Sequence, residues 1–443
     1  MAKLTHDDLI TLLLAISAML ILSRMVAEFG KRWGLPMVMG ELLVGIVLGP
    51  TVLGTWYPAG FNALFPLATN AHVSLALDGI VSLSVIMLLF VAGLELQLSQ
   101  VIRQGKTAIY TGLGGMLLPF ATGFAVAWYL PQCFGVPGGS ANHFLFALFL
   151  GTALSISALP VIARILLDMN MLRTTIGMVI IAGAIFNDIA GWLVFSFILS
   201  MVGQGQGEGA IGHTIIYIVA FSGAMLVVGR PLLNRVLPWV QTKLSWPGGV
   251  LALSLGLCLL SAAFTEAIHI HAILGAFIAG IAIGDSVHLR EQAREIIHQF
   301  VTNFFAPLFF VSIGLKVNFM QHFDGLIVAI VLVLAFVGKV VGAGLGARLG
   351  GMSGRHALAV GFGLNARGAM EIILGTLAFE AGIISQPVFV ALVVMALVTS
   401  ITSAPLMRHF ASDKGKGVGG EGWGVDRETP LAGSYGNEQR RDE

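Results

Sequence analysis

The sequence predicts an all-α membrane protein that crosses a bilayer about thirteen times. Of its 443 residues, 56% are hydrophobic and only 11% are charged, whereas a soluble domain carries about 25% charged residues. The hydrophobic residues also gather in segments of about 20, the length that a helix needs to cross the hydrocarbon core. A chain with this composition and pattern does not have enough polar side chains to cover the surface of a soluble protein.

The apolar segments define a transmembrane domain over residues 1–411. We expect its spans at 8–29, 35–53, 76–98, 107–130, 143–167, 174–203, 212–232, 247–267, 270–286, 301–317, 324–348, 356–380 and 385–407. Residues 412–443 are polar and Gly-rich, a composition typical of disorder. We therefore expect a disordered tail after the last span.

The positions of Lys and Arg predict the orientation of the chain. Nearly all of them lie in loops that follow odd-numbered spans or in the tail, whereas the opposite side holds Lys3 and Lys316. Because basic residues are enriched in cytoplasmic loops, we expect the N-terminus outside and the C-terminus in the cytoplasm. The net charge of +1 gives no reason to expect a nucleic-acid partner.

Two pairs of segments predict an internal repeat. GELLVGIVLGPTV (40–52) aligns without gaps with GAFIAGIAIGDSV (275–287), and LLFVAGLELQL (88–98) aligns with LFFVSIGLKVNF (308–319) after one insertion. Gly-rich apolar segments can resemble one another by chance, but both pairs are seven spans apart. An odd offset reverses the direction of crossing. This predicts an inverted repeat, which is typical of secondary transporters with a binding site near the midplane.

The repeat assigns boundaries within the domain. The first copy covers about 8–203 and the second about 247–407, with 212–232 as a linker span. This makes spans 143–167 and 356–380 partners, and we expect both to be broken helices that cross at the midplane.

Asp188 is the main candidate for chemistry, because it lies near the middle of the span 174–203. A carboxylate at membrane depth costs about 3 kcal/mol or more and marks a functional site by default. A carboxyl that can hold either a proton or a monovalent cation meets the chemical requirement of antiport. We predict that Asp188 binds Na⁺ or K⁺ in competition with H⁺; the alternative is a neutral, hydrogen-bonded packing residue.

The span 143–167 supplies further candidate ligands. Pro160 removes a helix hydrogen bond, and the hydroxyls of Thr152, Ser155 and Ser157 lie beside it. They can satisfy the freed backbone groups or help the freed carbonyls to coordinate a cation; the alternative is an ordinary proline kink. Asn187 offers another neutral oxygen, or a hydrogen bond that holds its helix in place.

Other buried polar groups are expected to support the site. Asn365, Arg367 and Glu371 lie in the Gly-rich segment GFGLNARGAMEIILG. Arg367 and Glu371 are four residues apart, so they can pair on one helix face, and we favour a structural pair over contact with the ion. Lys339 lies deep in the span 324–348, where it can bond near Asp188 or extend its ammonium towards the membrane surface.

Seven segments together resemble the monovalent cation:proton antiporter-2 superfamily. They are GELLVGIVLGPTVLG, LLFVAGLEL, ALSISALPVIARIL, FNDIAGW, APLFFVSIGL, GKVVG and NARGAMEIIL. The versions here look most like plant-type cation/proton exchangers and their bacterial relatives. The resemblance implies a homodimer with a dimerisation domain and a mobile six-helix core. It also implies that Asp188 is the ion- and proton-binding carboxylate, that the kinks of spans 143–167 and 356–380 cross beside it, and that Lys339 is the family's lysine. Separately, we expect the protein to lie among lipids, in a bacterial inner membrane.

Two features depart from that family. Electrogenic members carry two adjacent aspartates, the first of which pairs with the lysine, but Asn187 occupies that position here. This favours electroneutral, one-for-one exchange and leaves Lys339 without its usual partner. The tail is also too short for the nucleotide-binding domain of glutathione-gated potassium efflux systems, so we expect no gating of that type.

The predicted function is therefore antiport of Na⁺ or K⁺ against H⁺, since both cations take the same oxygen ligands. Two rivals use the same polar groups: a cation channel, and an ion-coupled symporter of an organic anion with Arg367 as the counter-ion. We expect no enzyme activity and no cofactor, because no nucleophile–base pair or metal cluster is found at membrane depth.

Overall fold

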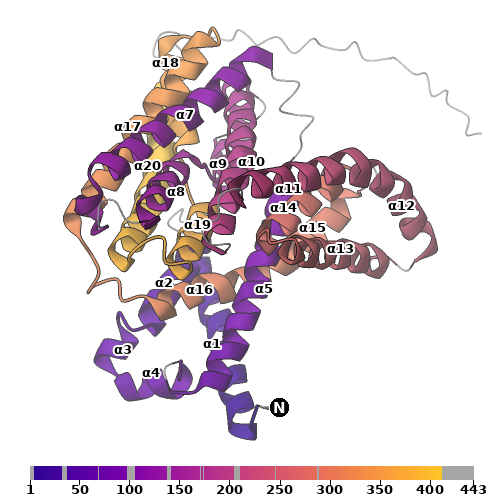
Figure 1. The fold of residues 1–443 in the computed structure, drawn as a ribbon, viewed down its shortest axis with the longest axis vertical. Coiled ribbons are helices and arrows are strands. Elements are labelled where there is room, and N and C mark those ends of the chain that lie inside the picture. The colour runs from indigo at the N-terminus through magenta and orange to yellow at the C-terminus, as the bar shows by residue number, and fades with distance from the viewer. Residues whose placement is uncertain are drawn as a thin grey trace, which may run out of the picture. The chain divides into compact units, whose positions relative to one another are not determined.

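Helices joined by short loops make up the computed structural model shown in Figure 1. The structure describes residues 4–31, 37–67, 69–96, 105–136, 141–169, 171–172, 174–203, 210–244, 246–286 and 289–411. No strand occurs in these ranges. The predicted tail, 412–443, lies outside the described residues. The all-α prediction is confirmed for the part that is described.

The helices follow one another along the chain with few long interruptions. In order they are α1 (His6–Lys31), α2 (Met37–Leu48), α3 (Leu53–Trp56), α4 (Pro58–Leu64), α5 (Ala71–Glu95), α7 (Gly105–Tyr129), η1 (Pro131–Phe134), α8 (Ala141–Ser155), α9 (Leu159–Asp168), α10 (Thr175–Gly203), α11 (Ala210–Ala224), η2 (Met225–Gly229), α12 (Arg230–Lys243), α13 (Gly248–Ala267), α14 (Ala272–Gly284), α15 (Glu291–Phe300), η3 (Val301–Phe305), α16 (Ala306–Lys316), α17 (Gly325–Leu349), α18 (Gly354–Leu364), α19 (Ala369–Glu380) and α20 (Gln386–Ala411). Here η1 is a 3₁₀ turn, whereas η2 and η3 are π-helical turns within longer helices.

Within the described residues, ten helices are long and apolar enough to cross a membrane. The bent pair α18–α19 makes an eleventh, and α8 and α14 are shorter apolar helices. The protein is therefore an integral membrane protein with multiple spans.

Several helices extend beyond the apolar segments that predict them. The span predicted at 301–317 begins at Glu291, because α15 continues through η3 into α16. The linker predicted at 212–232 likewise continues to Lys243. Hydropathy detects only the part of a helix that suits hydrocarbon, whereas backbone hydrogen bonding continues through polar residues. These two predicted spans are thus shorter than the helices that contain them.

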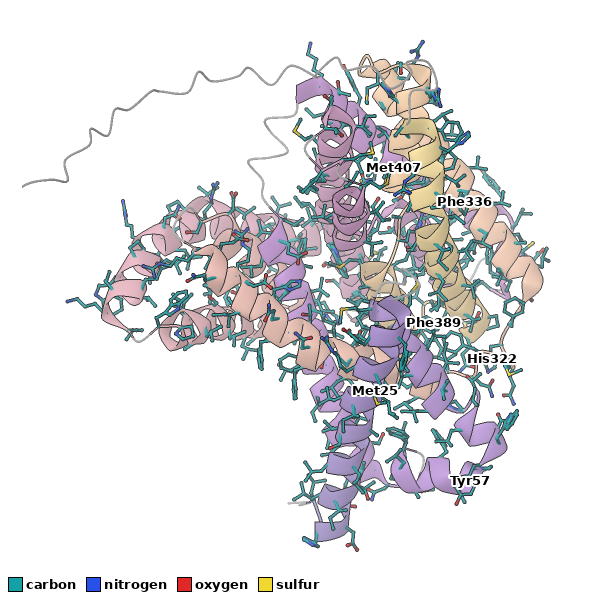
Figure 2. The ribbon with its side chains drawn as sticks, turned by 180° about the vertical axis from the view of Figure 1, so that it is seen from behind. Met25, Tyr57, His322, Phe336, Phe389 and Met407 are labelled. Carbon is teal, nitrogen blue, oxygen red and sulfur yellow. The ribbon has the colours of Figure 1, made fainter. Side chains whose placement is uncertain are left out.

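One set of helices packs around α7 and α17, which lie side by side in the upper part of Figure 1 together with α8, α18 and α20. Small residues allow the two helices to approach closely. A Cβ built at Gly342 of α17 would lie 3.0 Å from the Leu118 side chain and would press on the Gly114 carbonyl of α7. Aromatic contacts bind α20 to its neighbours: Phe389, labelled in Figure 2, stacks on Phe379 of α19 with ring centroids 5.7 Å apart.

A second set contains α1, α2, α5, α14 and α16, and it also uses glycines at its crossings. Gly45 of α2 lies against Val311 of α16, where an added Cβ would come within 2.9 Å of the Val311 Cα. Gly280 of α14 lies in the same way against α5, with the Leu94 nitrogen 2.9 Å from an added Cβ. The pairs α2–α16 and α14–α5 are therefore built alike.

Candidate cation-binding site

Asp188 lies on α10 with only 2% of its surface exposed. The backbone N–H groups of Ser157 and Leu159 lie close enough to its carboxylate to stabilise the negative charge. Leu159 begins α9, and the free N–H groups and the dipole at a helix N-terminus favour a negative charge. The Oδ1 atom of Asp188 has no hydrogen-bond partner among the described residues. The carboxylate therefore has charge-stabilising N–H groups beside it and one buried oxygen that no described group satisfies.

The predicted span 143–167 consists of two helices rather than one. Between the end of α8 at Ser155 and the start of α9 at Leu159, the chain leaves the helical conformation. Pro160 is the second residue of α9, where its missing N–H removes no intrahelical bond. The break therefore precedes the proline and exposes backbone groups at the depth of Asp188.

A second break lies in the span predicted at 356–380, between α18 and α19, which bend by 49°. The two breaks contact each other directly. The backbone N–H of Ala158 donates to the Ala366 carbonyl at 3.1 Å, and the Ser157 hydroxyl donates to the Leu364 carbonyl at 2.9 Å. Backbone groups freed by one break are thus satisfied by the other, which makes non-helical chain tolerable inside a membrane.

Arg367 connects the second break to the end of α8. Its guanidinium donates to the carbonyls of Ala153 at 2.9 Å and Leu154 at 2.6 Å, and it pairs with the Glu371 carboxylate. The positive charge of Arg367 is stabilised by the C-terminal carbonyls of α8, and the negative charge of Glu371 is stabilised in the first turn of α19. Both side chains are buried, so the pair joins two helix ends across the crossing.

Lys339 of α17 is fully buried and donates a hydrogen bond to the Ser155 carbonyl. Asn187 lies beside it. With its amide oriented to satisfy both polar atoms, Asn187 accepts from the Lys339 ammonium at 3.0 Å and donates to the Gly112 carbonyl at 2.8 Å. Lys339 is therefore bonded to neutral oxygens, within electrostatic range of Asp188.

The predicted hydroxyl ligands have their protons committed elsewhere. Thr152 donates to the Leu148 carbonyl at 2.7 Å, and Ser155 donates to the Gly151 carbonyl at the same distance. A hydroxyl that donates its single proton still has oxygen lone pairs. The structure places Ser155 and Ser157 at the break next to Asp188, and Thr152 one turn earlier on α8.

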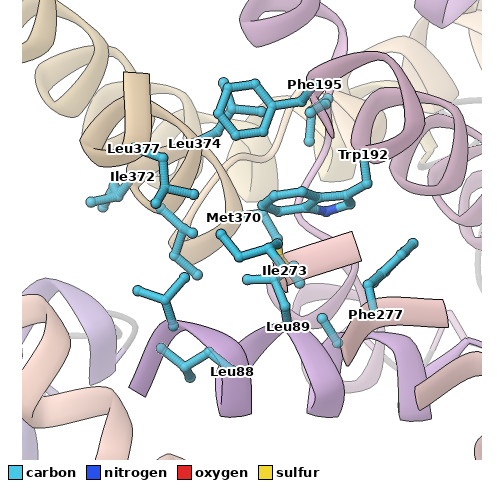
Figure 3. Close-up of a cluster of buried hydrophobic side chains, with 14 of the residues drawn as sticks. Leu88, Leu89, Trp192, Phe195, Ile273, Phe277, Met370, Ile372, Leu374 and Leu377 are labelled. Carbon is cyan, nitrogen blue, oxygen red and sulfur yellow. The ribbon is translucent and has the colours of Figure 1, made fainter. Parts of the chain in front are cut away.

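An apolar cluster lies next to the site, and our reading of the sequence did not include it. Figure 3 shows it, with side chains from α5, α10, α14 and α19. Its labelled members are Leu88, Leu89, Trp192, Phe195, Ile273, Phe277, Met370, Ile372, Leu374 and Leu377. Trp192 follows Asp188 by one helical turn, and its ring centroid is 6.1 Å from that of Phe277 on α14. The four-residue spacing from Asp188 is the signal that could have identified it.

The backbone donors at the start of α9 were also not predicted individually. Donation by Ser157 and Leu159 depends on where the break falls, and the sequence indicated only that Pro160 lies near it. Prolines are frequent in the first turn of a helix, so Pro160 itself was a signal that a helix begins next to it.

A buried carboxylate at the contact of two broken membrane helices is an arrangement typical of ion-coupled secondary transporters. The chain belongs to the sodium/hydrogen exchanger family, whose transmembrane-region model matches residues 14–409. The Na(+)/H(+) antiporter NhaS4 of Synechocystis is 30% identical over 406 residues, which cover 90% of this chain and 98% of that relative.

Other relatives are longer. Cation/H(+) antiporter 20 of Arabidopsis thaliana is 33% identical over 411 residues, which cover 89% of this chain and 48% of the relative. K(+)/H(+) antiporter 1 of Saccharomyces cerevisiae is 30% identical over 392 residues, which cover 85% of this chain and 44% of the relative. The chain thus spans about half the length of these two proteins.

The fold matches a solved structure. The sodium proton antiporter MjNhaP1 of Methanocaldococcus jannaschii aligns over 91% of this chain and 97% of its own, with a TM-score of 0.60 and 17% sequence identity. At that identity the likeness concerns the fold alone.

Proposed function

We propose that this protein exchanges a monovalent cation, Na⁺ or K⁺, for protons at Asp188, one for one and by alternating access. The proposal rests mainly on the Oδ1 atom of Asp188, which is buried at the contact between two helix breaks and has no hydrogen-bond partner among the described residues. The names of relatives support it: NhaS4 is a Na(+)/H(+) antiporter, and the yeast relative is a K(+)/H(+) antiporter.

The geometry suits a single exchangeable position. The N–H groups at the start of α9 lie beside the Asp188 carboxylate, and its unpartnered Oδ1 accepts a proton or a cation. When a cation arrives, the proton leaves to water on the same side of the membrane. Lone pairs on Ser155, Ser157 and Asn187, with Thr152 one turn away, are candidates to replace part of the cation's water shell.

Alternating access requires that one side of the site is closed while the other is open. The cluster in Figure 3 supports this, because it fills the space between α10 and α19 on one side and α5 and α14 on the other with apolar side chains. In our proposal, the helices around α7 and α17 move against the set containing α2, α5, α14 and α16. That motion separates the cluster and carries Asp188 from one side to the other.

Electroneutrality follows from the groups around Asp188. Asn187 has no proton to release, and Lys339 is bonded to neutral oxygens. If Asp188 alone changes its protonation state, one proton moves for each monovalent cation and no net charge crosses.

The inverted repeat and the count of thirteen spans are part of the same proposal. The ten long helices, the bent pair α18–α19 and the two shorter apolar helices α8 and α14 together make thirteen. The alike pairs α2–α16 and α14–α5 are those that a two-fold repeat would relate. The breaks after α8 and α18 would be related in the same way.

We also propose a homodimer among lipids of a bacterial inner membrane, with its N-terminus outside and its C-terminus cytoplasmic. The distribution of basic residues supports the orientation. Large apolar side chains are exposed on α1 and α11, including Leu13, Leu14 and Val219. Such side chains suit contact with lipid or with a second subunit.

Proteoliposomes with a pH-sensitive dye inside test the proposal. Pulses of Na⁺, K⁺, Li⁺ or Rb⁺ should drive proton movement in the wild type, whereas a channel would dissipate the cation gradient without coupled proton movement. Asp188→Asn should abolish the movement. Asp324→Asn is the matched control, because Asp324 caps α17 at an exposed position and Asn caps equally well. Wild-type rates in folded Asp188→Asn would refute the assignment.

A further inference from the structure

Asn365 is fully buried at the second helix break, immediately after α18. Neither atom of its side-chain amide has a hydrogen-bond partner within the described part of the chain. Burying an amide without a partner costs about 1–3 kcal/mol. A group with that cost at a functional site calls for a partner that the protein itself does not supply.

The backbone connects Asn365 to Asp188 through one short segment. The Ser157 hydroxyl donates to the Leu364 carbonyl and the Ala158 N–H donates to the Ala366 carbonyl, so the two acceptors flank Asn365 on either side. The same segment provides the N–H groups of Ser157 and Leu159 that lie beside the Asp188 carboxylate. The unpartnered amide of Asn365 and the open oxygen of Asp188 therefore belong to the same crossing.

We propose that the side-chain oxygen of Asn365 is a direct ligand of the transported cation, contributed by the second broken span. This inference rests on the proposed function. Na⁺ and K⁺ are hard cations that take oxygen ligands, and an amide oxygen can replace a water molecule of the hydration shell. Because the amide is neutral, this ligand strengthens cation binding without adding a second group that exchanges protons.

Neighbouring polar groups are less suited to this role. The Arg367 guanidinium would repel a cation, and the Glu371 carboxylate is already paired with it. The Ser157 hydroxyl already has a hydrogen-bond partner in the Leu364 carbonyl, although its oxygen keeps lone pairs. Asn365 differs from them in having both amide atoms unoccupied among the described residues.

Asn365→Ala should raise the apparent KM for the cation about tenfold, the size expected when a dipole that contacts a charge is removed. The maximal rate should change less than KM. In detergent, the purified variant should need about tenfold more Na⁺ or K⁺ to gain the same rise in unfolding temperature, because a ligand stabilises in proportion to ln(1 + [L]/Kd). Asn365→Gln should change the relative KM values for Na⁺, K⁺ and Rb⁺, because it moves the oxygen.

Asn365→Asp gives a readout that a purely structural residue would not affect. It adds a carboxyl that can exchange its own proton, so transport should become sensitive to membrane potential. This variant keeps the shape of the side chain, and it tests the proposal even if Asn365→Ala does not fold. The control is Thr376→Val in the same broken span, where the threonine is buried and its hydroxyl is bonded to the Ile372 carbonyl of its own helix.

The outcomes separate this inference from the proposed function. If the wild type moves no protons when cations are added, the proposed function fails. If the wild type exchanges and folded Asn365→Ala keeps the wild-type KM and ion preference, the role of Asn365 as a ligand is overturned. Where the alanine variant does not fold, Asn365→Asp decides. A folded Asn365→Asp variant that keeps the wild-type KM and stays independent of potential overturns the role in the same way. Equal effects on KM in Asn365→Ala and Thr376→Val would overturn it as well.

Discussion

Lys339 donates a hydrogen bond to the main-chain carbonyl of Ser155, the last residue of α8. The two residues are 184 positions apart, and the contact ties the middle of α17 to the first helix break. The second bond from Lys339 goes to the Asn187 oxygen at 3.0 Å. Both acceptors are neutral, so this lysine supports the break rather than pairing with a carboxylate next to Asp188.

From this arrangement we predict electroneutral exchange. Proteoliposomes under a clamped potential should exchange at the same rate at zero and at about 100 mV, whereas an electrogenic exchanger would feel about 2.3 kcal/mol per charge moved. Lys339→Gln should slow transport by weakening the break, and it should leave the rate independent of potential. Potential dependence in the wild type that is lost in Lys339→Gln would show that the lysine carries a proton.

The proposed competition of the proton and the cation for Asp188 predicts that the apparent KM for the cation depends on pH. Acid favours the protonated carboxyl, so KM should rise as pH falls. The increase should approach about tenfold per pH unit once the proton-bound form dominates, since one unit corresponds to about 1.4 kcal/mol. Initial rates measured over a range of cation concentrations between pH 6 and 9 test this. A flat KM would exclude competition at one site.

Removing one member of the Arg367–Glu371 pair should destabilise the protein more than removing both. Arg367→Met leaves the Glu371 carboxylate buried and unpaired, at a cost of about 3–5 kcal/mol. The double variant Arg367→Met/Glu371→Met removes both charges of the pair, and it should recover part of that loss. Thermal unfolding in detergent compares the two. If the losses are additive, the two side chains do not act as a pair.

Close packing of α7 against α17 should make Gly342 intolerant of any side chain. Gly342→Ala places a Cβ against the Gly114 carbonyl and the Leu118 side chain, and overpacking of this kind costs about 1–3 kcal/mol. Gly256→Ala on α13 is the matched control, because no atom lies within 4 Å of its added Cβ. The unfolding temperature should be lower for Gly342→Ala than for the wild type, and it should be unchanged for Gly256→Ala. Equal stability of the two would contradict the close packing of α7 against α17.

The sequence by itself determined the class of the protein and the position of its main candidate residue. Apolar segments long enough to cross a bilayer, and one carboxylate in the middle of such a segment, are properties of short stretches of chain. Their energetic consequences hold in any fold that spans a membrane. The all-α membrane fold and the choice of Asp188 as a candidate therefore needed no tertiary information.

Tertiary structure decided what surrounds Asp188. Arg367 was expected to pair with Glu371 on one helix, and it also reaches the carbonyls of Ala153 and Leu154, more than 210 positions earlier. Contacts of this kind depend on how two breaks cross, which hydropathy does not encode, because each break shows only as Gly, Pro and polar residues within its own span. The backbone donors to Asp188 and the neutral partners of Lys339 have the same origin: they exist because distant helix ends meet.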